Sequence, residues 1–188
     1  MTRLILTFTL LAIFATSNGF CQSDNGYVVT LKNDTIRGRL KNFGEIKSCN
    51  KVDLVDNKKA RRKYKPKHLK AYQIDNSIYV TQRAERPLKL GSALVFMKLV
   101  VDGDVRLFRY HYFAQTGGAG PNQPSISTPE IDYYLERDGK LTLVRSLGFK
   151  KSMSIYFRDN RELIKLIQNK DLKYRNMEEI VRIYNEGR

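Results

Sequence analysis

The strongest indication of fold class lies in residues 26–41, GYVVTLKNDTIRGRLK. Apolar and polar residues alternate before the polar pair Asn33-Asp34 and alternate again after it. Strict alternation is typical of β-strands, and two such runs around a polar turn predict an antiparallel hairpin. In the second run Arg37, Arg39 and Lys41 share one side while the apolar residues share the other, which indicates a sheet with one solvated side.

Short strands continue this pattern along the chain. They are predicted at residues 51–55, 70–75 and 78–82, with Asn76-Ser77 between the last two. Gly38, inside the second strand of the first hairpin, indicates a bend or a bulge. We therefore expect residues 22–86 to form a small barrel-like unit or a strongly twisted sheet.

Residues 87–188 are predicted to form a β-meander followed by helices. Hairpins are expected around Asp102-Gly103-Asp104 and around Asp138-Gly139, since apolar runs flank both turns. Between them, residues 116–130 contain several glycines and prolines and show no apolar periodicity. This composition predicts a long, flexible, exposed loop.

The hydrophobic period changes near the C-terminus. Asp159 followed by Glu162, and Asn176 followed by Glu179, fit capping boxes that open amphipathic helices. A helix pair is therefore expected within residues 159–186, packed on the sheet. The predicted fold class is α+β and mainly β: antiparallel hairpins with a small barrel-like N-terminal part, then a β-meander and two short C-terminal α-helices.

The first 21 residues have the layout of a secretory signal peptide: a basic start, an apolar run and a small, polar end. The apolar run is shorter than the roughly 20 residues that span a bilayer, so no transmembrane segment is expected in the mature chain. Phe20 is too large for a lipoprotein signal ending at Cys21. We expect export to the periplasm or the extracellular space, with Cys49 then the lone cysteine, for which a buried apolar role is favoured.

Composition limits the function classes. The chain has 188 residues, a net charge of +15, 41% hydrophobic residues and 28% charged residues. These values exclude general disorder, collagen-like and coiled-coil chains and multi-span membrane proteins. The excess of cations predicts anionic partners. Since an exported protein seldom meets nucleic acid, lipopolysaccharide phosphates or acidic glycans fit the expected compartment better.

The residues at both ends of the mature chain suggest a family. Gly26-Tyr27-Val28-Val29-Thr30-Leu31, Asp34-Thr35-Ile36-Arg37-Gly38 and the C-terminal Ile180–Asn185 resemble a set of uncharacterised exported proteins of the Bacteroidota. That resemblance implies envelope location and no assigned activity. Asp34-Thr35-Ile36 is similar to the O-glycosylation acceptor of that phylum, which makes Thr35 a candidate for modification; a plain hairpin turn also explains it. The strand rhythm alone resembles SH3-like and Sm-like barrels.

The densest group of cations lies between residues 58 and 70. Such a run is predicted to attract phosphates, sulfates or an acidic polymer, and Tyr64 and Tyr72 lie in and near it. The alternative is a solvated hairpin loop whose charges keep the protein soluble. The candidate anion-binding residues are Lys58, Lys59, Arg61, Arg62, Lys63, Lys65, Lys67 and Lys70.

The predicted strand at 105–113 places Phe108, Tyr110 and Tyr112 on one side. An exposed row of aromatic rings can stack on sugars. The alternative, which is the commoner case for such a row, is a core row covered by the C-terminal helices.

No catalytic or metal-binding pattern emerges from the sequence. Neither His68 nor His111 has an acid nearby in sequence to orient it, and metal-ligand spacings are missing, so no cofactor or metal is predicted. These observations favour an exported binding or interaction module with a basic surface. The alternatives are an enzyme that acts on cell-wall or glycan material and a structural partner of an outer-membrane assembly.

Overall fold

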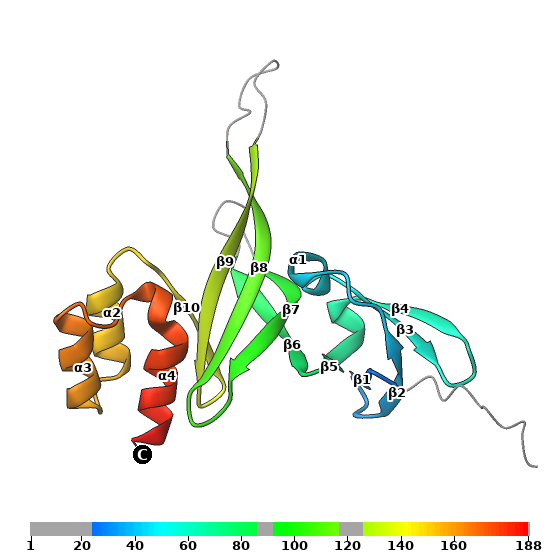
Figure 1. Cartoon of the computed structure of the whole chain (residues 1–188), viewed down its shortest axis with the longest axis horizontal. Coiled ribbons are helices and arrows are strands. Elements are labelled where there is room, and N and C mark those ends of the chain that lie inside the picture. Colours follow the sequence, from blue (N-terminus) through cyan, green and yellow to red (C-terminus); the bar gives the residue numbers. More distant parts are fainter. Residues whose placement is uncertain (1–23, 86–91, 117–125, 188) are drawn as a thin grey trace, which may run out of the picture.

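One antiparallel sheet extends through the whole molecule. The computed structural model describes residues 24–85, 92–116 and 126–187, and within them ten strands follow the order β10-β9-β8-β7-β6-β5-β1-β2-β3-β4 (Figure 1). The strands are β1 Gly26–Thr30, β2 Thr35–Leu40, β3 Val52–Asp56, β4 Arg61–Tyr64, β5 Leu69–Ile74, β6 Ser77–Glu85, β7 Ser92–Val101, β8 Arg106–Thr116, β9 Ile126–Arg137 and β10 Lys140–Val144. The helices are α1 Glu45–Ser48, η1 Pro66–His68, α2 Phe149–Tyr156, α3 Arg161–Gln168, η2 Tyr174–Asn176 and α4 Met177–Glu186.

The predicted mainly antiparallel fold with short C-terminal helices is confirmed, but no barrel forms. Strand β1 pairs with both β2 and β5, and β6 then pairs with β7, so the sheet stays open. The strand β4 was expected to be part of a basic loop. Its sequence RRKY has no apolar alternation, and its pairing with β3 is what makes it a strand.

The two sides of the sheet have different roles. Residues paired across neighbouring strands share a side, so the register assigns Phe96, Leu107 and Leu135 to one side, which we call the helix face. Phe108 and Tyr134 lie on the other side, which we call the reverse face. The helix face packs against the helices at the β7–β10 end and forms the N-terminal core at the β1–β5 end.

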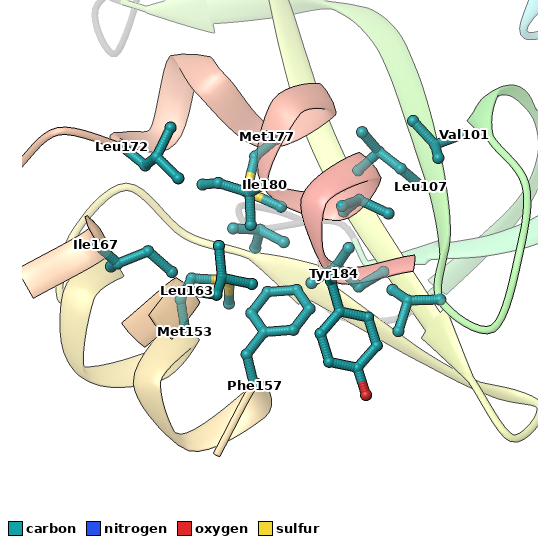
Figure 2. Close-up of a cluster of buried hydrophobic side chains, with 14 of the residues drawn as sticks. Val101, Leu107, Met153, Phe157, Leu163, Ile167, Leu172, Met177, Ile180 and Tyr184 are labelled. Atoms are coloured by element: carbon teal, nitrogen blue, oxygen red, sulfur yellow. The ribbon is translucent and has the colours of Figure 1, made fainter. Parts of the chain in front are cut away.

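Three buried clusters follow from this arrangement. The N-terminal cluster includes Val28, Leu54 and Phe96, and the helical cluster joins β7–β10 to α2–α4 (Figure 2). A third cluster on the reverse face contains Met97 and Phe108. All three clusters are built from residues 28–184, so a chain that begins at Gln22 keeps every residue of the core.

Three α-helices, not two, form the C-terminal bundle. Helix α2 was missed because its buried residues, Phe149 and Met153, give only one helical repeat and it has no capping box. At α3 the cap is Asn160, whose Oδ1 accepts a hydrogen bond from Leu163 N at 3.0 Å, and not the expected Asp159. Asp159 instead accepts a hydrogen bond from the Tyr184 hydroxyl at 2.6 Å.

At the start of α4, Asn176 is the cap residue, but its side chain makes no capping bond to the helix. It instead accepts a hydrogen bond from Lys173 N and donates one to Glu179.

The β8–β9 hairpin rises from the sheet as a two-stranded ribbon (Figure 1). Strand β9 begins at Ile126, so the last residues of the loop predicted at 116–130 belong to a strand; residues 117–125 lie outside the described ranges. Pro129 had argued for a loop. It is tolerated because β10 pairs with β9 only from Tyr133 onward, which leaves Pro129 on a strand edge.

Cys49 occupies the point where β7 and β8 separate. Its carbonyl accepts a hydrogen bond from Phe96 N at 2.9 Å, and its thiol is bonded to the backbone of His111. The residue is fully buried, and burial raises the pKa of the Cys49 thiol to about 11. The thiol therefore stays protonated at neutral pH and serves as a packing group, the role favoured from the sequence.

The side chain of Asn185 joins α4 to the β7–β8 turn. Its Oδ1 accepts a hydrogen bond from Val105 N at 3.0 Å, and its Nδ2 donates to Val105 O at 2.9 Å and to Asp102 O at 3.4 Å. At Gly103 a Cβ would lie 2.5 Å from Asn185 Nδ2, so this turn requires glycine.

Candidate anion-binding face

The reverse face of β2 and β4 gathers cations from two separate parts of the sequence. The register places Arg37 and Arg39 of β2, and Lys41 just after it, on the same side as Arg61 and Lys63 of β4. All five are exposed. Because β3 separates the two strands, the two rows are about 10 Å apart, with about 7 Å between cations along a strand. We call these five residues the basic face.

A hollow of about 370 Å³ lies on this face, lined by Arg39, Lys41, Asp53, Val55 and other residues nearby. Arg61 completes it, with its Nη2 2.7 Å from Asp53 Oδ2. The Asp53 residue is 3% exposed, and its Oδ1 has no hydrogen-bond partner in the structure. The buried carboxylate thus holds Arg61 in place, and the other cations of the face remain available to an anion.

The cationic run predicted as one site divides over several surfaces. Arg61 and Lys63 lie on the basic face, whereas Arg62 points to the helix face and pairs with Asp56 at 3.2 Å. Lys58 and Lys59 lie in the β3–β4 turn, Lys65 and Lys67 lie at η1, and Lys70 on β5 bonds to Asn33 Oδ1 at 2.6 Å. All of these side chains are exposed.

The tyrosines near the run do not join the basic face. Tyr72 is 1% exposed and donates a hydrogen bond to Ser48 O at 2.8 Å, and Tyr64 packs against the N-terminal cluster. Two other aromatic rings lie beside cations: Tyr27 under Arg37, and Phe43 within 5.4 Å of Lys41 Nζ. The alternation in residues 36–41 predicted the cations of β2 on one side of the sheet. The cations of β4 join them only because β3 pairs with both strands, which the sequence does not indicate.

The aromatic side of β8 lies mainly in the core. Phe108 is fully buried in the reverse-face cluster, while Tyr110 and Tyr112 are half-buried and stack at 5.3 Å between ring centroids. The helices cover the opposite side, at Leu107, and not the Phe108 side as the packing alternative expected. Burial raises the pKa of Tyr112 to about 12, and its hydroxyl is bonded to Asp132.

The structure pairs His111 with an acid that is distant in sequence. His111 Nδ1 lies 3.3 Å from Glu45 Oε2, and Glu45 also approaches Lys98 Nζ at 3.8 Å. Burial lowers the pKa of His111, with Arg109 and Lys98 adding to the effect and Glu45 opposing it. The ring is therefore neutral at pH 7, but its Nε2 is covered and without a hydrogen-bond partner. His68, by contrast, is exposed.

Thr35 is exposed at the first position of β2, opposite Val29. Residues 1–21, for which the sequence predicts a signal peptide, lie outside the described ranges. In the part of the chain that the structure describes, no group of three or more His, Cys, Asp or Glu side chains is placed to hold a metal ion. None of the helices in that part is both long and apolar enough to cross a bilayer.

Comparison with protein-family models finds no match to the chain. Searches of curated proteins and of solved structures likewise find no significant match.

Proposed function

We propose that the protein is an exported envelope protein that binds an anionic polymer through its basic face and acts as a binding module. The observation that supports this most directly is the placement of five cations on one side of β2 and β4 around a single buried acid, Asp53. A regular array of cations on a rigid sheet binds a polyanion by counterion release, and rings beside it can contact flat groups of the ligand.

The proposed ligands are lipopolysaccharide phosphates and acidic glycans. Both fit the envelope location that the N-terminal 21 residues and the resemblance to exported Bacteroidota proteins imply. Binding requires no general base or nucleophile, so the covered Nε2 of His111 has no role in it.

The test uses the chain from Gln22 and measures binding to lipopolysaccharide, heparin and single-stranded DNA across a salt series. A basic-face variant changes Arg37, Arg39, Lys41 and Lys63 to Ser and keeps the Arg61–Asp53 pair intact. We expect its affinity for the preferred polymer to fall by about tenfold or more, with a shallower dependence on salt.

A matched control removes the same charge elsewhere, by changing Lys151, Arg158, Arg175 and Arg182 of the helical region to Ser; all four are exposed. It should bind nearly as well as the unchanged chain. Equal losses in the two variants would show that net charge alone governs binding, and absence of binding to all three polymers would refute the proposal.

A further inference from the structure

A second surface, distinct from the basic face, lies beside the ribbon. A groove of about 590 Å³ runs between the residues around α1 and the β8–β9 ribbon. Phe43 and Ile46 line one wall, and Phe113, Pro129 and Ile131 line the other. Phe113 is 55% exposed and Ile131 is 40% exposed. Adjacent large apolar side chains that stay this exposed are typical of an interaction site, and the volume is in the range of ligand-binding clefts.

The groove differs from the basic face in its charge. Its lining includes one acid and one cation of the α1 region, Glu45 and Lys47, whose charges balance. Glu130 also lies at its edge, but it pairs with Tyr112 and therefore points to the reverse face, away from Phe113 and Ile131. The lining thus has no excess of cations to attract a polyanion, and its exposed apolar side chains favour an apolar ligand.

The ribbon also offers free backbone groups along β8. Phe113 pairs with Pro129, which has no N–H, so this pair is of the non-hydrogen-bonded type. The N–H and C=O groups of Phe113 and Gln115 therefore point away from β9. In the described ranges, β7 pairs with β8 only as far as Arg109, so no strand lies along this part of β8.

Contacts two residues earlier along β8 support the outward direction of these backbone groups. The backbone of His111 is bonded to the Cys49 thiol on the same outer edge, and on the β9 side the Ile131 carbonyl accepts a hydrogen bond from the Tyr174 hydroxyl. The β9 edge is thus protected by Tyr174 and by Pro129, whereas, among the residues that the structure describes, no strand covers the β8 edge beyond His111. Protection of one edge alone directs an incoming strand to the other.

We propose that this groove binds an extended segment of a partner polypeptide, in which apolar side chains alternate with polar ones. The segment pairs with the β8 edge at Phe113 and Gln115. Its apolar side chains contact Phe43, Phe113 and Ile131. Backbone pairing supplies affinity in this mode of recognition, and the groove supplies specificity.

The experiment selects hexapeptides from a displayed random library on the chain from Gln22. We expect enrichment of sequences in which apolar and polar residues alternate. A selected peptide, synthesised and titrated, should bind about tenfold or more weakly to the double variant Phe113→Ser, Ile131→Ser. N-methylation of the alternate backbone nitrogens that face β8 should abolish binding of the peptide. N-methylation of the other alternate set, which faces away from β8, should leave binding intact.

Two control variants separate this proposal from the proposed polyanion site. Glu130→Gln, whose side chain lies on the reverse face, should bind the selected peptide normally. The basic-face variant with Lys41 retained should also bind it normally; Lys41 is kept because it lies against Phe43. Failure here and failure of the proposed polyanion site are therefore distinguishable. The proposal is overturned if no alternating pattern is enriched, or if the Phe113→Ser, Ile131→Ser chain, with an unchanged melting temperature, binds equally well.

Discussion

At the scale of single residues, Asn185 shows how one side chain can fix a helix to a sheet. Its three hydrogen bonds satisfy backbone groups of the β7–β8 turn. Asn185→Ala leaves Val105 N without its partner, and an unpaired, partly buried donor costs about 1–3 kcal/mol. We expect the free energy of unfolding to fall by that amount in urea titrations, while Glu186→Ala, an exposed neighbour, changes it little. Equal effects of the two substitutions would contradict this role.

His111 makes stability depend on pH. Burial holds the folded-state pKa of this residue below its usual value of 6.5, so below that pH the unfolded chain binds more protons than the folded one. Stability is therefore lost as the pH falls from about 7.5 through 6.5. The groups that face the ring are Glu45, Arg109 and Lys98, of which only Glu45 favours the charged form.

The measurement is the melting temperature of the unchanged chain and of His111→Gln between pH 7.5 and 5.5. The melting temperature of His111→Gln should fall less steeply toward acidic pH than that of the unchanged chain. His68→Gln, which alters an exposed histidine, is the control and should retain the full decline. Asp132, whose pKa is raised by burial, contributes with the opposite sign, and the difference between chains removes its effect. Identical slopes for His111→Gln and the unchanged chain would disprove the assignment.

At the scale of elements, the contribution of α4 to stability depends on the side chains that it buries. Ile180 is fully buried among the helices and the sheet (Figure 2). Ile180→Ala should lower the free energy of unfolding by about 2–5 kcal/mol, because the cavity it leaves cannot close fully. Leu166→Ala on α3, where the side chain is 37% exposed, is the comparison and should cost clearly less. Chemical denaturation of both variants decides the matter.

The elements with one buried and one solvated side could be predicted, because their sequence repeats with the period of a strand or a helix. The first hairpin and α4 show the expected periods because each has one buried side and one wet side. Strand β4 and helix α2 were not, since RRKY is a strand only through its neighbour β3, and α2 buries only Phe149 and Met153.

The same limit applies to the sites. Alternation predicted Arg37 and Arg39 on a solvated side, but only pairing through β3 brings Lys63 of β4 beside them. The contact between Glu45 and His111 joins a loop helix to a distant strand, and no local spacing indicates it.

At the scale of the whole molecule, β6 and β7 connect the cores on both sides of the sheet. Phe96 packs in the N-terminal cluster, and its neighbours Val95 and Met97 pack in the reverse-face cluster. We therefore expect a single cooperative unfolding transition, with near-UV tyrosine signals and far-UV circular dichroism coinciding, since the chain has no Trp. Phe96→Ala should shift both signals together; two separate transitions would show independent halves.

The seven residue pairs between β6 and β7 also have a consequence for engineering. A chain divided between Glu85 and Ser92 yields one fragment that lacks Phe96 from its core and another that presents the complementary strand. Each piece alone exposes an apolar strand edge, and each supplies what the other lacks. Co-expressed, the two fragments should reassemble without a linker, which would make them a pair of tags that join any two proteins fused to them.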